Sequence, residues 1–293
     1  MSDQKTRHII AISGGKDSSA LAIYMREPNR WQKHLGKTEA TPREPIEDAE
    51  FVFCDTGTEL EETYEYLDQL ELYLGKPIVR LQADSPPGKT PFDHYLELYG
   101  GFLPSANMRW CTRNLKIKPF ENYIGEDPVV NYVGIRADED REGYISTKDN
   151  IVSKFPFRDD GLDKQDIYRI LEDSGLGRPE YYDWRSRSGC YFCFYQRRSE
   201  WVGLKENHPA LYEKAKAYEK VDDATGEHFT WSDTESLAEL EDPERMEEIM
   251  QQAEKRRERL KQNMSNRSLM EVFFEDEVRD LEDDGKGCNI CHL

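Results

Sequence analysis

A short apolar run followed by two glycines is the feature that most constrains the fold of this chain. Residues 9–12 read Ile-Ile-Ala-Ile, and Ser-Gly-Gly-Lys-Asp-Ser-Ser follows at residues 13–19. The run predicts a buried strand, and the residues after it predict the start of a helix. Glycines let backbone N–H groups approach an anion, and a helix N-terminus adds unpaired donors and a positive dipole end. The stretch therefore predicts a phosphate-binding loop between a strand and a helix.

Further strands and helices alternate along the first half of the chain. Residues 49–54, 77–81 and 129–137 predict strands, and residues 59–74 predict an amphipathic helix that stops at Gly75. Alternating strands and helices predict an α/β fold, with a parallel sheet covered by helices on both faces. The polar, proline-bearing residues 28–48 are expected to form a surface excursion with no chemistry of its own.

The glycine stretch differs in spacing from the G-x-x-x-x-G-K-[ST] loop of P-loop NTPases. It resembles the S-G-G-x-D-S motif of the PP-loop ATP pyrophosphatases, within the phosphoadenosine phosphosulfate (PAPS) reductase-like family. The resemblance implies a Rossmann-like, adenine nucleotide alpha hydrolase-like domain that binds ATP and Mg²⁺ and cleaves ATP between the α- and β-phosphates. Lys16 and Asp17 are the implied catalytic residues, Asp17 either as a helix cap or as a metal ligand. The implied ATP-binding residues of the loop are Ser13, Gly14, Gly15, Lys16, Asp17, Ser18 and Ser19.

Asp55-Thr56-Gly57 follows the second predicted strand. The carboxyl ends of neighbouring parallel strands meet at one edge of a sheet, so Asp55 and Thr56 are expected beside the loop. PAPS reductase-like proteins carry a similar Asp-Thr-Gly near the nucleotide. A plain turn at the end of a strand is the alternative.

A basic cluster follows at residues 109–118, with no carboxylate among these residues. It resembles the R-x-C-T-x-x-L-K-x-x-P stretch that lies on the substrate side of the nucleotide site in PAPS reductase-like proteins. Arg109, Arg113 and Lys116 are therefore candidate substrate ligands, and solvated helix charges are the alternative. Cys111 is a candidate redox or sulfur-carrying thiol.

Gly-Ile-Arg-Ala-Asp-Glu-Asp-Arg at residues 134–141 resembles the family's second substrate-side motif, whose last arginine is Arg141. Arg136 and Arg141 are candidates for binding phosphate or sulfate oxygens in a bidentate manner. Pairing with the flanking acidic residues is the alternative.

Four of the six cysteines form two C-x-x-C pairs, Cys190/Cys193 and Cys288/Cys291. Two such pairs in a cytosolic chain favour a metal over disulfides, so these four cysteines are predicted to ligate one centre, either a [4Fe–4S] cluster or zinc. Aromatic residues around the first pair suit a dry metal site. A thioredoxin-like dithiol, or a reductase-like catalytic cysteine at 288 or 291, remains an alternative.

Composition limits the remaining choices. The chain has 293 residues, which we divide into an α/β domain at 1–150 and a mainly helical, cysteine-bearing region at 151–293. The net charge of −19 argues against tight autonomous binding of nucleic acid, so a nucleic acid would be reached through partner subunits. There is no apolar run long enough for a membrane span and no signal peptide, so a cytoplasmic location is expected.

The resemblance implies an ATP pyrophosphatase that adenylates a substrate for sulfur insertion. The complete loop and the paired cysteines favour the ATP-pyrophosphatase component of DNA phosphorothioation systems. The implied partners are a cysteine desulfurase as sulfur donor and other subunits of a DNA-modification complex. Alternatives are a PAPS or adenylylsulfate reductase, a tRNA-thiolating enzyme, or a nucleotide-sensing accessory subunit without turnover.

Overall fold

A five-stranded parallel sheet forms the centre of the molecule. The computed structural model describes residues 5–140, 146, 148–222, 227–232 and 234–264. The strand order is β3-β2-β1-β4-β5, and every neighbouring pair is parallel. The sequence order reverses between β1 and β4, which is where open α/β sheets bind ligands. The strands are β1 (Arg7–Ile12), β2 (Glu50–Cys54), β3 (Ile78–Leu81), β4 (Val129–Tyr132) and β5 (Ile151–Lys154).

Alternating side chains of the sheet feed two different cores. In β1, Ile10 and Ile12 pack into one apolar cluster, whereas Ile9 and Ala11 pack into another on the opposite face. A strand buried on both faces reads as a continuous apolar run, which is why residues 9–12 are all apolar. Within the described residues, no helix is long and apolar enough to cross a bilayer.

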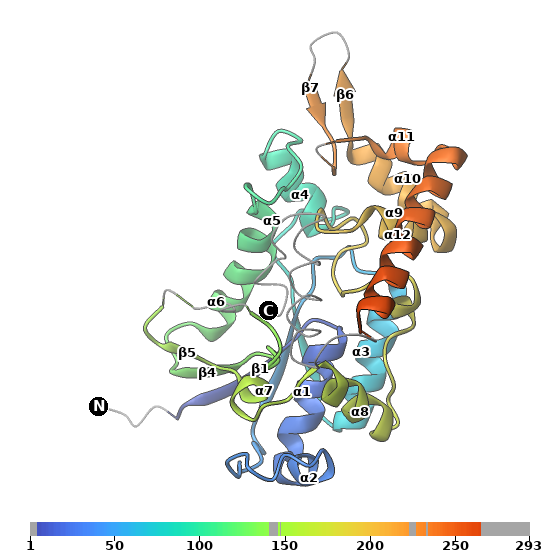
Figure 1. The fold of residues 1–293 in the computed structure, drawn as a ribbon. Helices are drawn as coiled ribbons and strands as arrows, with labels where there is room; N and C mark the ends of the chain where they lie inside the picture. The colour runs from blue at the N-terminus through green and yellow to red at the C-terminus, as the bar shows by residue number, and fades with distance from the viewer. Residues whose placement is uncertain (1–4, 141–145, 147, 223–226, 233, 265–293) are drawn as a thin grey trace.

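Helices cover both faces of the sheet (Figure 1). On one face, α1 (Lys16–Arg26), α3 (Glu61–Leu74) and α8 (Lys164–Asp173) contribute Leu21, Leu70 and Ile170 to the core. On the other face, α6 (Lys118–Ile124) contributes Phe120 and Ile124. The α/β fold with helices on both faces, predicted from the sequence, is confirmed.

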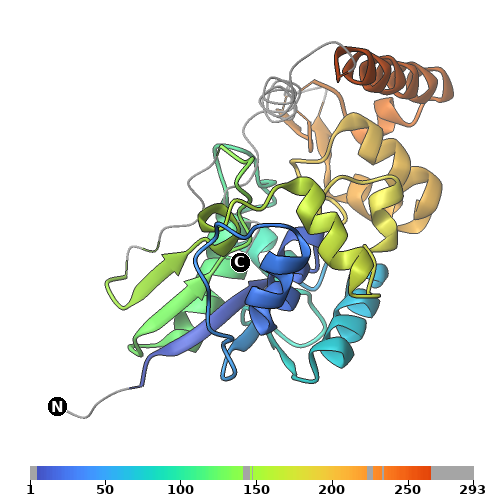
Figure 2. The same cartoon turned by 60° about the horizontal axis from the view of Figure 1, so that its bottom comes forward.

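A mainly helical region follows the sheet and lies together at one end of it (Figure 2). Its core is aromatic: the ring centroids of Phe92 and Phe192 are 4.3 Å apart, and those of Phe192 and Trp231 are 4.9 Å apart. Phe92 belongs to α4 (Pro91–Leu98), so this core joins the first half of the chain to the second. The elements of this region are η2 (Glu180–Asp183), α9 (Arg198–Asn207), α10 (Pro209–Tyr218), β6 (Lys220–Asp222), β7 (Glu227–Phe229), α11 (Leu237–Leu240) and α12 (Pro243–Met264).

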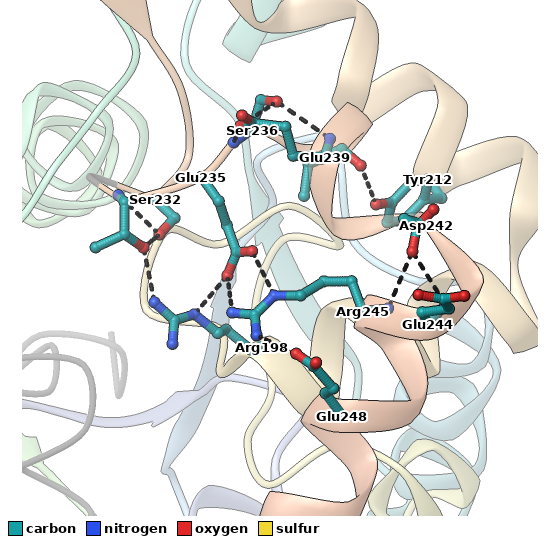
Figure 3. Close-up of polar contacts among 12 residues, drawn as sticks. Arg198, Tyr212, Ser232, Glu235, Ser236, Glu239, Asp242, Glu244, Arg245 and Glu248 are labelled. Carbon is teal, nitrogen blue, oxygen red and sulfur yellow. Dashed lines mark hydrogen bonds and ion pairs between the residues drawn. The ribbon is translucent and has the colours of Figure 1, made fainter.

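Glu235 ties two of these helices together (Figure 3). Its carboxylate accepts hydrogen bonds from Arg245 Nε of α12 at 2.9 Å and pairs with Arg198 Nε of α9 at 2.7 Å. Asp242 caps α12, because its Oδ1 accepts the N–H groups of Glu244 and Arg245. The helix α12 therefore begins directly after Asp242, with Pro243 as its first residue.

Several elements differ from the sequence-based expectation. Residues 28–48 contain α2 (Pro28–His34), whose Trp31 is buried in the core, so this stretch is a surface excursion only in part. The fourth strand ends at Tyr132, since the chain turns away at Gly134, where a Cβ would lie 2.9 Å from Asp17 O. The sheet continues beyond residue 150 with β5, which the sequence did not reveal. The proposed division at residue 150 stays a prediction. The remaining short elements are α4 (Pro91–Leu98), α5 (Trp110–Thr112), the π-helix η1 (Arg113–Ile117) and α7 (Pro156–Asp159).

Candidate functional site

The glycine loop joins β1 to α1 at the carboxyl edge of the sheet and holds its own shape through Ser18. The Ser18 hydroxyl accepts the Ser13 N–H at 3.0 Å and donates to Gly15 O at 3.1 Å. Ser13 Oγ lies 3.1 Å from Ser18 Oγ. Ser18 is therefore used to close the turn. The side chain of Ser19 is fully buried, and its Oγ has no hydrogen-bond partner within the described residues.

Both glycines of the loop are required by close approach. Gly14 has φ +71°, and a Cβ there would lie 2.6 Å from Thr63 Cγ2 of α3. A Cβ on Gly15 would lie 2.6 Å from Ser188 Oγ. The loop is thus pressed between α3 and the segment that precedes the first C-x-x-C pair.

A buried chain of charges starts at the first residue of α1. Lys16 Nζ lies 2.8 Å from Asp17 Oδ2, and Asp17 Oδ1 lies 2.9 Å from Arg136 Nη1. Burial alone would lower the pKa of Lys16, but Asp17 and the Tyr182 oxygen together outweigh it and the pKa lies above its usual value. Lys16 therefore stays charged, directly after the loop glycines.

Arg136 is held by carboxylates in this chain of charges. Besides Asp17, it pairs with Asp138 at 2.9 Å and Glu139 at 2.5 Å. Of the two readings drawn from the sequence, the structure shows the one in which flanking acids pair with Arg136. Arg141, the other arginine of this motif, lies outside the described residues.

Asp55 and Thr56 lie at the end of β2, as their position in the sequence predicts. The Asp55 carboxylate accepts hydrogen bonds from the Gly57 N–H at 2.8 Å, the Tyr64 hydroxyl at 2.7 Å and Gln82 Nε2 at 2.7 Å. These contacts fix the turn. Their role toward a nucleotide stays a prediction.

Thr56 links this turn to the first C-x-x-C pair. Its Oγ1 donates to Glu59 Oε1 at 2.9 Å and lies 3.2 Å from Cys190 Sγ. Burial raises the pKa of Glu59, and burial together with the nearby Glu59 raises the pKa of Cys190 to about 12. Glu59 is a polar residue of the site region that sequence reasoning missed, since it reads as an ordinary acidic residue before a helix.

The basic cluster surrounds a π-helix. The π-helix η1 begins at Arg113, whose side chain is exposed, and ends before Lys118. Arg109 donates to Ala106 O at 3.0 Å and lies 5.4 Å from the centre of the Tyr195 ring. Within the described part of the chain, neither Arg109 nor Arg113 pairs with a carboxylate. Such turns of π-helix occur frequently at functional sites.

The arginines around the first C-x-x-C pair serve mainly as internal supports. Arg185 is buried and donates to the carbonyl oxygens of Gly189 at 3.0 Å and Cys190 at 2.6 Å. Arg198 pairs with Glu235 (Figure 3). Arg187 lies 5.9 Å from the centre of the Tyr195 ring, whose other cationic neighbour is Arg109. Tyr195 therefore joins the two arginine-bearing stretches in space.

The cysteines are placed only in part. Cys190 and Cys193 form a tight turn in which the Cys193 N–H donates to Cys190 O at 3.0 Å, and the predicted aromatic surround is present. Within the described residues, no three His, Cys, Asp or Glu side chains gather in a way that could hold a metal ion. Cys288 and Cys291 lie outside those residues, so the four-cysteine site stays a prediction. Cys111 is partly buried beside the same aromatic core.

Three residues that sequence reasoning missed contact the loop from far along the chain. Tyr181 donates its hydroxyl hydrogen to Gly14 O at 2.8 Å, and the Lys16 N–H donates to Tyr182 OH at 3.1 Å. Ser188 Oγ lies 3.1 Å from Ser13 Oγ. No motif marks these residues, because their importance comes from tertiary contact alone.

More than half of the chain is similar to a known domain family. Residues 7–183 match a family model described as the phosphoadenosine phosphosulfate reductase domain. An uncharacterised protein of Methanocaldococcus jannaschii is 29% identical over 219 residues, covering 70% of this chain and 40% of that protein. A nin region protein of Escherichia phage lambda, also uncharacterised, is 27% identical over 224 residues, covering 67% of this chain and 68% of its own.

The tRNA-specific 2-thiouridylase MnmA of Pseudomonas putida is 26% identical over 240 residues, covering 70% of this chain and 56% of the enzyme. A solved structure of phosphoadenylyl-sulfate (PAPS) reductase from Candida auris aligns with a TM-score of 0.41 at 13% identity, covering 63% of this chain and 80% of that one. The chain thus spans less than half the length of its Methanocaldococcus relative. Because the matched residues 7–183 make up more than half of the 293 residues, the chain belongs to the phosphoadenosine phosphosulfate reductase domain family.

Proposed function

We propose that this protein is an ATP pyrophosphatase that cleaves ATP between the α- and β-phosphates and adenylates a substrate for sulfur insertion. The observation that carries the proposal is the loop at residues 13–19. It lies between β1 and α1, beside the point where the strand order reverses, and places Lys16 at the helix N-terminus. Backbone N–H groups, a helix dipole and an ammonium group together suit a pyrophosphate.

The residues divide into two sets in this proposal. The loop and Lys16 bind the pyrophosphate part of ATP, and Mg²⁺ shares its charge. An oxygen of the acceptor attacks the α-phosphorus, the bond to the β-phosphate oxygen breaks and pyrophosphate leaves. Arg109, Arg113 and Lys116 bind the acceptor and stabilise its added negative charge. A sulfur nucleophile then displaces AMP.

For the acceptor, we propose the DNA backbone, as in phosphorothioation, with a cysteine desulfurase as sulfur donor and partner subunits that carry the DNA. The chain's net charge of −19 fits DNA delivery by partners. A tRNA acceptor is the second candidate, favoured by the 26% identity to a tRNA-specific 2-thiouridylase over 240 residues. Sulfate-bearing nucleotides, as the substrate of a reductase, are the third.

The paired cysteines are the candidate ligands of a metal centre. We propose that Cys190 and Cys193 supply two ligands of a [4Fe–4S] or zinc centre and that Cys288 and Cys291 supply the other two. Cys190 is partly buried against the aromatic cluster around Phe192, and an apolar surround of this kind suits such a centre. Anaerobic purification followed by iron, sulfide and zinc analysis tests this. Absence of all three, with four thiols open to alkylation, contradicts it.

The experiment that tests the proposed function is product analysis with ATP and Mg²⁺. We expect AMP and pyrophosphate, with release stimulated by the correct acceptor. ADP as the product contradicts the proposal, and binding without any product in the presence of acceptor and sulfur donor favours a nucleotide sensor. Incubation with ³⁵S-labelled cysteine, a desulfurase and either DNA or tRNA then identifies the acceptor by the polymer that becomes labelled.

A further inference from the structure

A segment from the second half of the chain packs onto the phosphate loop. It runs from Tyr181 to Ser188 and makes three polar contacts with residues 13–16, at 2.8, 3.1 and 3.1 Å. Tyr181 is 1% exposed and Ser188 is 9% exposed, so their two contacts are shielded from water, whereas Tyr182 is partly exposed. The segment is therefore a built part of the site.

One of these contacts engages a donor that a phosphate would need. The Lys16 N–H belongs to the first residue of α1, and its hydrogen bond goes to the hydroxyl oxygen of Tyr182 at 3.1 Å. Ser188 instead donates its hydroxyl hydrogen to Ser13 Oγ at 3.1 Å, so it engages an acceptor of the loop. A Cβ on Gly15 would lie 3.1 Å from Tyr182 OH and 2.6 Å from Ser188 Oγ, so both oxygens lie directly over the bare backbone of the loop.

The third contact, like that of Ser188, engages an acceptor of the loop. Tyr181 donates to Gly14 O, a carbonyl acceptor for which an anionic phosphate oxygen has no use. Tyr181 and Tyr182 thus offer a matched pair: adjacent phenols that contact the same loop, one at a donor and one at an acceptor.

We propose that the Tyr182 hydroxyl competes with a phosphate oxygen for the Lys16 N–H of the loop and thereby sets the affinity and the rate of nucleotide binding. The inference rests on the proposed function, because it concerns phosphate at this loop. One N–H group donates one strong hydrogen bond, so the phosphate must displace the phenol oxygen to receive it. Tyr182 is then a residue that determines affinity, although it lies outside the recognisable motif.

The segment also connects the loop to the first C-x-x-C pair. Arg185 binds the carbonyl oxygens of Gly189 and Cys190, and the Tyr191 N–H donates to Thr58 O at 2.9 Å. Displacement of Tyr182 by a phosphate would therefore move a stretch that is anchored at residues 189–191. Phosphate binding and the position of Cys190 are linked by this short stretch of chain.

The test measures binding of inorganic pyrophosphate and of α,β-methylene-ATP to the full chain by calorimetry and stopped flow. Tyr182→Phe keeps the ring, which lies 5.4 Å from Lys16 Nζ, and removes only the hydroxyl. We expect about two- to tenfold tighter binding, the range given by one neutral hydrogen bond, with most of the gain in the association rate.

Tyr181→Phe is the control and should leave the affinity within about twofold, since its partner is a carbonyl. Weaker binding by Tyr182→Phe would show that the hydroxyl assists phosphate, and unchanged binding would show that it plays no part; both overturn the inference. Equal tightening by Tyr181→Phe and Tyr182→Phe would assign the effect to general loosening and also overturn it. If the wild type binds neither ligand, the proposed function fails together with the inference. Unfolding midpoints within a few degrees of wild type confirm that each variant is folded.

Discussion

Gly14→Ala tests whether the loop is as tightly packed as the structure indicates. Gly14 has φ +71°, and the new methyl group would lie 2.6 Å from Thr63 Cγ2, a side chain that is 1% exposed. The left-handed backbone costs a non-glycine residue about 1–2 kcal/mol. Overpacking against a buried helix adds about 1–3 kcal/mol. The expected loss of unfolding free energy is therefore about 2–5 kcal/mol.

Urea denaturation followed by circular dichroism measures this loss. With an m-value of about 2–3 kcal/mol/M, the midpoint should fall by about 1–2 M. Gly36→Ala is the matched control, because Gly36 has φ +75° and nothing lies within 4 Å of its added Cβ. That variant should show only the backbone cost of about 1–2 kcal/mol.

A second substitution separates the two contributions. Thr63→Ser removes Cγ2, so in the Gly14→Ala background it should restore about 1–3 kcal/mol in a double-mutant cycle. The reasoning is refuted if Gly14→Ala costs no more than Gly36→Ala, or if Thr63→Ser restores nothing.

Three further predictions concern the loop, the basic cluster and the buried thiol of Cys54. Lys16→Met should abolish AMP release and weaken ATP binding by about ten- to a hundredfold, which is the contribution of a charged hydrogen bond. Asp17 should stay paired with Arg136 in this variant. Undiminished AMP release would contradict the assignment of the loop. Arg113→Glu combined with Lys116→Glu should weaken acceptor-stimulated turnover more than ATP binding. A larger loss in ATP affinity, measured by titration with ATP, would place these side chains at the nucleotide instead. Burial raises the pKa of the Cys54 thiol from 9.0 to about 12. Alkylation of Cys54 in the folded protein at pH 8 should therefore be at least about 1,000-fold slower than alkylation of an ordinary thiol. The rate should rise about tenfold per pH unit up to pH 12. Rapid labelling of folded Cys54 at pH 8 is the contrary result.

The fold was predictable to the extent that local signals expressed it. The run at residues 9–12 is apolar because both faces of β1 are buried, and Gly75 ends α3 in the left-handed conformation. The strand β5 escaped prediction because Val152 is 54% exposed and the four-residue strand has no alternation to detect. The helix α2 escaped it because buried Trp31 is the one large apolar side chain among its seven residues.

The candidate site divides in the same way. The loop was recognisable because its chemistry is carried by consecutive residues. The ion pair between Asp17 and Arg136 joins residues 119 positions apart, and the contact of Ser188 with Ser13 joins residues 175 positions apart, so neither leaves a local pattern. For Arg136 the sequence offered two readings, and only the packing of α1 against the turn after β4 distinguishes them.

The long separation between the loop and its covering segment has a consequence for biosynthesis. β1 emerges from the ribosome first, yet its neighbour β4 pairs through Arg7 and Val129, and Tyr182 follows later still. Contacts so distant along the chain form slowly, because a long loop must close before they are gained. A nascent chain that has exposed residues 1–150 would therefore carry the glycine loop without Tyr181, Tyr182 and Ser188 over it. During translation, the N–H groups of the loop would be open to any phosphate-bearing metabolite until the second half of the chain has folded.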